Sequence, residues 1–190
     1  MEKLTSDKEL YFENILNSRV TVHHFKTEPV PRQIIDKALK SFMSTPNHFL
    51  TKPWRIYVLG RESITKTIDL NTEEIRRQKG EKAAKLKKSR WSSVPCWILI
   101  NCLLNEDNIR FQEDYAACAC GIQNMMLSLW SNGYGSKWTT GQVTRHERFS
   151  KIIGFDQSEE MVVGLLWCGL PNAPLVKKSR ESSVNVTWLP

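Results

Sequence analysis

The longest helical pattern in the chain lies between residues 111 and 130. Apolar and small side chains recur there at three- and four-residue spacing, which is the period of an α-helix: Phe111, Tyr115, Cys118, Ala119, Ile122, Met125, Met126, Leu129 and Trp130. The positions between them are small rather than charged at 116–121, so we expect this helix to be buried on more than one side. Small side chains would also allow the backbone of a second subunit to approach closely. Asn132-Gly133 should end the helix, because Gly adopts the left-handed conformation at little cost.

Shorter patterns predict the remaining elements. Helices are expected at 4–18, 31–43 and 146–153, together with a long polar and basic helical stretch at 62–90 that breaks near Gly80. Strands are expected at 54–59, 96–102 and 161–169, with an extended segment at 20–25. Residues 184–189 are predicted to pair as an edge strand or to dock elsewhere. Because strands alternate with helical excursions, the fold class should be a single α+β domain with three layers, in which helices flank a central sheet.

Residues 133–141 follow the central helix and combine three Gly with Tyr134, Trp138, Lys137 and several hydroxyls. Two interpretations remain open. The stretch is either a wall for a flat polar ligand, or a turn followed by a short strand.

Length and composition are ordinary for one soluble domain of 190 residues, with 41% hydrophobic and 25% charged side chains. No apolar run approaches the roughly 18 residues that a membrane span needs, and the N-terminus lacks a signal-like apolar stretch. We therefore expect a cytoplasmic protein without a membrane partner. The five Cys lie in apolar segments without metal-finger spacing, which favours reduced thiols packed in the core.

The net charge of +7 comes largely from residues 76–90, where eight basic residues face only one acidic residue, Glu81. A nucleic-acid surface, a solvated helix and a positive rim that attracts phosphate-bearing small molecules would all produce this run. Its confinement to one segment favours the solvated helix, so no nucleic-acid partner is expected.

Histidines offer few candidate ligands. His23 and His24 are adjacent, so on an extended segment they point to opposite faces and cannot chelate one ion together. His48 lies in a Pro-bounded loop, where it is either a packing residue or a ligand contact. No acidic partner stands at ligand spacing, and we expect no metal site. Dinucleotide, P-loop and nucleophile-elbow motifs are also missing.

Four short motifs near the N-terminus follow one another in the order and spacing of a known family. They are Arg19–Phe25, Glu28–Pro31, Met43–His48 and Lys52–Arg55. Together they resemble the nitroreductase family of flavoproteins, in its short, histidine-containing branch. The helix at 116–130, the Gly-containing stretch at 133–141 and the strand at 162–169 continue the resemblance, which covers about residues 10 to 172.

This resemblance implies an α+β homodimer that holds FMN at the subunit interface. Such proteins pass two electrons from NADH or NADPH to nitroaromatics, quinones or related small acceptors by a ping-pong route. The flavin carries the chemistry, so no catalytic side chain is predicted. The whole chain, 1–190, would be one FMN-binding domain, and the tail 174–190 would pack on the partner subunit.

The resemblance also implies which residues contact the cofactor. Arg19, Val20 and Thr21 match the family segment that binds the FMN phosphate and ribityl chain. Ser44 and His48 match loop positions that reach the flavin bound by the partner subunit. Trp138, Thr139 and Thr140 match the family loop whose backbone and hydroxyls contact the flavin. A second phosphate contact from Lys178 or Arg180 is a further expectation.

Several positions depart from the family pattern. Val20 and Thr139 replace family Arg residues, Leu50 replaces an Asn, and Lys52 replaces a Gln. The loss of positive charge predicts weaker FMN binding, unless the basic run at 76–90 compensates. An alternative function follows from these losses: a flavin-binding relative with little turnover that acts as a sensor or carrier.

Overall fold

A four-stranded antiparallel sheet forms the centre of the protein, with strand order β1-β2-β4-β3. The computed structural model describes residues 6–175 and 185–189. The strands are β1 (Trp54–Val58), β2 (Cys96–Leu103), β3 (Gly135–Thr139) and β4 (Glu160–Gly169). All their pairings are antiparallel; the one parallel pairing in the described chain is an isolated bridge between Thr21 and Ser136.

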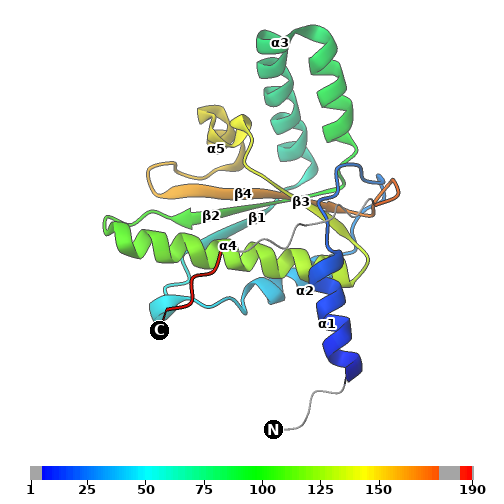
Figure 1. The fold of residues 1–190 in the computed structure, drawn as a ribbon. Helices are drawn as coiled ribbons and strands as arrows, with labels where there is room; N and C mark the ends of the chain where they lie inside the picture. The colour runs from blue at the N-terminus through cyan, green and yellow to red at the C-terminus, as the bar shows by residue number, and fades with distance from the viewer. Residues whose placement is uncertain (1–5, 176–184, 190) are drawn as a thin grey trace.

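Helices cover both faces of the sheet (Figure 1). One face carries α2 (Arg32–Phe42) and α4 (Asn108–Ser131), and the other carries α3 (Arg61–Ser92) and α5 (Glu147–Ile153). The first helix, α1 (Ser6–Ser18), packs against α4. Two short 3-10 turns, η1 (His48–Leu50) and η2 (Gln142–Arg145), complete the element order. The predicted three-layer α+β architecture is confirmed.

The buried strand β2 separates two hydrophobic clusters. Ile98 and Ile100 face α2 and α4, whereas Trp97 and Leu99 face α3 and α5. This alternation follows from the pleat of a strand, in which successive side chains point to opposite faces. On the α3 side, Trp91, Trp97 and Trp167 form a cluster with ring centroids 5.0 to 5.5 Å apart.

The central helix α4 begins and ends as its sequence requires. The Asp107 carboxylate accepts backbone hydrogen bonds from Ile109 and Arg110 at 2.9 and 3.3 Å, which caps the N-terminus. Gly133, with a φ of 80°, follows its C-terminal end. A Cβ at Gly121 would lie 2.5 Å from the Phe42 ring, so the smallest residue of the helix admits a side chain of α2.

The outward face of α4 is open in the single chain. Ala116 and Cys120 are exposed, while Ala117, Cys118 and Gly121 are buried. Within this chain the helix is therefore buried on one side, and the expected burial on a further side would need a second subunit.

The break predicted near Gly80 is present. Gly80 has φ 81° and ψ 175°, and it divides α3 into two helical segments that run antiparallel and project from the sheet (Figure 1). The expected helices at 4–18, 31–43 and 146–153 correspond to α1, α2 and α5.

The C-terminal residues 185–189 form no strand, and Trp188 is 90% exposed. The expected edge strand is thus not seen in these residues, and Val184 lies outside the described residues. No described helix has the length and apolar character to cross a membrane. Four of the five Cys are buried and Cys120 is exposed, all as free thiols.

Candidate functional site

The segment after α1 lies beside the edge strand β3. Thr21 pairs with Ser136, and the Val22 N–H donates to the Ser136 carbonyl at 3.0 Å. Gly135 makes this approach possible, because a Cβ there would lie under 3.0 Å from the Val22 side chain. The fold therefore brings the segment that starts at half-buried Arg19 next to β3, the strand that ends in Trp138 and Thr139 and is followed by Thr140.

The stretch at 133–141 contains a turn followed by the strand β3, and its role as a wall for a flat ligand stays a prediction. The Trp138 indole packs over Gly164 and donates from Nε1 to the Val163 carbonyl at 3.1 Å. Thr140 follows the strand and is exposed. Residues 138–140 thus present a fixed indole and two hydroxyls at the end of an edge strand.

A group of three cations lies on the α3 face of the same strand. Lys137 of β3 has its Nζ 5.0 Å from the Trp167 ring centroid, and Lys87 of α3 has its Nζ 5.7 Å from the Trp91 centroid. Those two rings are 5.0 Å apart. Arg90, three residues after Lys87 on α3, is the third member, and its positive charge helps to lower the pKa of both lysines. We call Lys87, Arg90 and Lys137 the cation group.

The cation group concentrates positive charge that has no acidic partner in the described chain. Burial, followed by the charges of Arg90 and Lys87, lowers the pKa of Lys137. Burial, followed by the charge of Arg90, also lowers the pKa of Lys87. None of the three makes an ion pair within residues 6–175 and 185–189, and the Arg90 Nε atom is buried without an acceptor there. Buried donors are normally satisfied, so the group fits a negatively charged ligand.

Sequence reasoning missed this group as a unit. Lys137 was visible as the single cation of 133–141, and Arg90 as the end of the basic run. They come together because Trp91 of α3 packs on Trp167 of β4, over which Lys137 also lies. Within the run at 76–90, Lys87 and Arg90 are half-buried, while most of the others are exposed.

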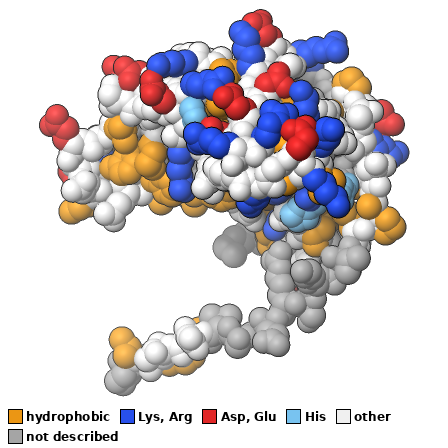
Figure 2. Space-filling model, turned by 90° about the horizontal axis from the view of Figure 1, so that it is seen from above, with side chains coloured by type: hydrophobic (Ala, Val, Ile, Leu, Met, Phe, Trp, Pro, Cys, Tyr) orange, Lys and Arg blue, Asp and Glu red, His pale blue; other side chains and the backbone are white. Residues whose placement is uncertain are grey.

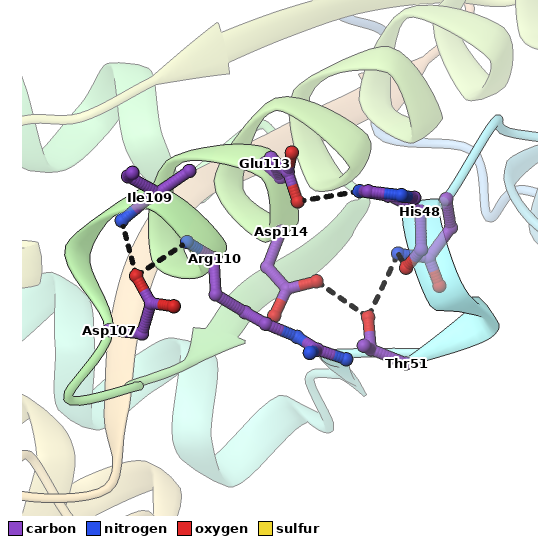
Figure 3. A network of polar contacts seen from close by, with 8 residues as sticks. His48, Thr51, Asp107, Ile109, Arg110, Glu113 and Asp114 are labelled. Carbon is purple, nitrogen blue, oxygen red and sulfur yellow. Dashed lines mark hydrogen bonds and ion pairs between the residues drawn. The ribbon is translucent and has the colours of Figure 1, made fainter.

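His48 lies in a separate network at the N-terminal part of α4 (Figure 3). Its Nδ1 is 2.8 Å from Glu113 Oε2. Thr51 Oγ1 donates to Asp114 at 2.5 Å and accepts from Asn47 Nδ2 at 2.9 Å. Two acidic residues of α4 thus fix the loop that carries His48.

This loop holds an unusual backbone. Phe49, Leu50 and Lys52 have φ values of 58°, 53° and 47°, and they are the only non-Gly residues with positive φ in the described chain. Such conformations persist only where the surroundings enforce them, and they concentrate at functional sites. The exposed Phe49 ring stacks on His48 at 3.9 Å and lies 4.7 Å from the Arg110 guanidinium.

The two sets of residues lie at opposite ends of α4. His48 contacts Glu113, whereas Ser18, next to Arg19, accepts a hydrogen bond from Trp130 Nε1 at 2.8 Å. Glu113 and Trp130 are 17 residues apart on one helix, about 25 Å at 1.5 Å per residue. Within one chain, His48 and Arg19 therefore lie far apart.

Ser44 lies between these ends. It is exposed and lines a hollow of about 520 Å³ between α1, α2 and α4, together with Tyr11 and Asn124. The further phosphate contacts expected from Lys178 or Arg180 lie outside the described residues.

Known proteins share this three-layer fold. The model of the Nitroreductase family matches residues 16–170, so the chain belongs to this family. The Bacillus subtilis (strain 168) protein YfhC, whose NAD(P)H nitroreductase name is provisional, is 30% identical over 170 residues, 87% of each chain.

Solved structures of nitroreductase-like proteins are also similar to this chain. A nitroreductase-like family protein from Bacillus cereus superposes with a TM-score of 0.78 at 28% identity, covering 95% of this chain and 93% of that one. A nitroreductase with bound FMN from Bacteroides fragilis NCTC 9343 has a TM-score of 0.71 at 15% identity, covering 93% and 98%. At that identity the likeness concerns the fold.

Proposed function

We propose that this protein is an FMN-dependent NAD(P)H oxidoreductase of nitroreductase type that reduces small acceptors by two electrons in a ping-pong cycle. Its family membership supports a flavoprotein oxidoreductase. The observation that carries the proposal is the cation group, whose Lys137 follows Ser136, the β-bridge partner of Thr21; its buried Arg90 Nε lacks an acceptor in the described chain. For a nitroarene, the balanced reaction is nitroarene plus NAD(P)H plus H⁺ to nitrosoarene plus NAD(P)⁺ plus water.

The residues available suit FMN. Arg19, Val20 and Thr21 would hold the phosphate and ribityl chain, because a guanidinium with nearby backbone and hydroxyl donors binds phosphate well. Backbone and hydroxyl groups at 138–140 would contact the flavin ring. Bound FMN would supply the hydride chemistry, while the chain binds and orients it. The cation group would supply positive charge that Val20 and Thr139 no longer provide.

The site would be completed in a homodimer. Ser44 and His48 would reach the flavin of the partner subunit, since His48 is about 25 Å along α4 from Trp130 in one chain. The exposed small residues Ala116 and Cys120 would let the two copies of α4 approach closely. The whole chain would act as one FMN-binding domain, with residues 174–190 packed on the partner.

A visible absorption spectrum tests the proposal. The purified protein is supplemented with FMN, desalted, and mixed anaerobically with NADH and then with NADPH. We expect a retained flavin band that bleaches with at least one donor. Failure to retain flavin would contradict the proposal. A retained band that neither donor bleaches would favour the alternative, a flavin-binding sensor or carrier, for which the replacements at Val20 and Thr139 are the supporting observation.

A further inference from the structure

A hollow of about 620 Å³ opens where β3 ends. The pairing of β3 with β4 stops at Thr139 and Leu165, so the first residues of β4 have no β3 neighbour. The hollow is lined by Tyr115 of α4, by Thr140, Thr144 and Arg145 around η2, and by Glu160 of β4, among others. Ligand sites for single small molecules have volumes of this order.

Two opposite charges line this hollow without pairing with each other. Arg145 is exposed, and its guanidinium makes no hydrogen bond or ion pair within the described residues. Glu160 is half-buried and fixed: its two carboxylate oxygens lie 3.0 and 2.9 Å from the Tyr57 hydroxyl, and Asn101 Nδ2 donates to Oε2 at 2.9 Å.

Glu160 retains capacity for another donor. The Tyr57 hydroxyl has a single proton to share between the two carboxylate oxygens, whereas a carboxylate accepts about four hydrogen bonds. Arg145 has five N–H donors in a planar fork, which suits a carboxylate. Apolar side chains also line the hollow, among them Phe155, Met161 and Val162, and so does the polar Gln157. The lining of the hollow therefore combines a positive group, a negative group and apolar surface.

We propose that this hollow binds the electron acceptor, and that it selects a planar aromatic molecule with a carboxylate at one end and a hydrogen-bond donor at the other. Arg145 binds the carboxylate and Glu160 accepts from the donor. The assignment rests on the proposed function, because Thr140 both lines the hollow and belongs to the residues proposed to contact FMN.

Three non-reducible probes test this selection by isothermal titration calorimetry on the FMN-loaded protein. They are 4-hydroxybenzoate, which carries both groups, benzoate, which carries only the carboxylate, and phenol, which carries only the donor. We expect 4-hydroxybenzoate to bind about tenfold more tightly than either other probe, since one hydrogen bond to a charged group is worth that factor.

Two variants assign the two ends. Arg145→Gln should weaken 4-hydroxybenzoate and benzoate about tenfold and leave phenol unchanged. Glu160→Gln should abolish the advantage of 4-hydroxybenzoate over benzoate. Arg148→Gln and Glu159→Gln are the matched controls: both residues are exposed near the same elements, neither lines the hollow, and neither change should alter any probe.

The outcomes separate this proposal from the proposed function. Equal affinities for the three probes, or an Arg145→Gln variant that binds benzoate normally, would overturn the selection even if NADH or NADPH bleaches the flavin. Binding to FMN-free protein that disappears on FMN loading would also overturn it, because the flavin would then fill the hollow. Arg145 is exposed, so its variant remains informative if Glu160→Gln fails to fold. Bleaching of the flavin is scored separately and tests only the oxidoreductase.

Discussion

The indole of Trp138 occupies the space in which residue 164 would carry a side chain: a Cβ on Gly164 would lie under 3.0 Å from Trp138 Nε1. The same indole donates to the carbonyl of the preceding residue, Val163. A glycine in the central strand β4 thus sets the position of a side chain in the proposed flavin site.

Replacement of Gly164 by Ala should therefore displace Trp138. We expect a loss of about 1–3 kcal/mol in the free energy of unfolding, as for other overpacked cores, together with reduced FMN retention. Urea denaturation and flavin content measure the two effects. Gly60→Ala is the control, because no atom lies within 4 Å of a Cβ there, and it should cost at most about 1 kcal/mol as a helix-cap change. Equal effects of the two changes would argue against this packing.

The positive φ of Phe49 predicts that a Gly variant is more stable than an Ala variant at this position, which is the reverse of the usual order in a helix. Both Phe49→Gly and Phe49→Ala remove the ring, but only Gly relieves the left-handed backbone, so the Gly variant should be more stable by about 1–2 kcal/mol. At exposed Leu86, inside α3, the order should reverse, with Gly less stable than Ala by about 0.5–1 kcal/mol. Thermal and urea unfolding of the four variants decide this. If Ala were also the better residue at position 49, the loop would not hold its positive φ in solution.

The Tyr57 hydroxyl predicts a change of stability at high pH. Burial, then its hydrogen bond to Glu160, raises the pKa of Tyr57 from 10.0 to about 12. Between these values the unfolded chain loses the Tyr57 proton while the folded chain keeps it, so stability should fall as the pH rises from 10 to 12. Tyr57→Phe should show a shallower fall over this window. Tyrosinate absorbance of the folded protein should show an ionisation with a pKa of about 12 that Tyr57→Phe lacks; identical profiles for both proteins would contradict the assignment.

Loss of a cation near the proposed phosphate and flavin contacts should weaken FMN binding. Arg19→Ala and Arg90→Gln should each raise the FMN dissociation constant about tenfold, because each removes a charge-assisted hydrogen bond. Lys82→Gln removes a charge from an exposed position of α3 and should leave the constant unchanged. Fluorescence titration with FMN provides the measurement. Unaltered binding by Arg90→Gln would remove the cation group from the site.

The proposed homodimer predicts a size effect at Cys120, which is exposed on the outward face of α4. Cys120→Trp should shift the protein to a monomer in sedimentation or size-exclusion experiments, and FMN should be lost with the dimer. Cys120→Ser keeps the residue small and should remain dimeric with full flavin. A dimeric, flavin-loaded Trp variant would place the interface elsewhere.

Local patterns in the sequence predicted most of the fold. The 3.6-residue period predicts α2 and α4, the continuous apolar run predicts β2, and Gly80 predicts the break in α3, because each signal depends on residues close in sequence. The short strand β3 was ambiguous. Its strand state follows from its pairing with β4 and with Thr21, and these contacts are long-range.

The site was predictable in part for the same reason. Family motifs pointed to Arg19–Thr21 and to Trp138–Thr140; the fold pairs Thr21 with Ser136, on the strand that leads to Trp138, and the contacts of both segments with a cofactor stay predictions. The approach of Arg90 to Lys137 depends on how α3 packs, which no local pattern reports. The positive φ values at Phe49 and Leu50 also had no signal, because neither residue type favours that conformation. Their backbone is held by the Asn47 and Thr51 side chains and, through Thr51, by Asp114.

The Gly80 turn has a practical consequence. A Cβ there would have no atom within 4 Å, and the neighbouring residues 79–82 are exposed. The turn is at the far tip of the projecting α3 hairpin (Figure 1), and the charged side chains of α3 and α5 spread over the face seen in Figure 2. Exposed tips of this kind accept inserted sequence with little effect on the rest of a domain. An affinity tag or a fluorescent domain could therefore be inserted at this turn, which would leave both chain termini unmodified.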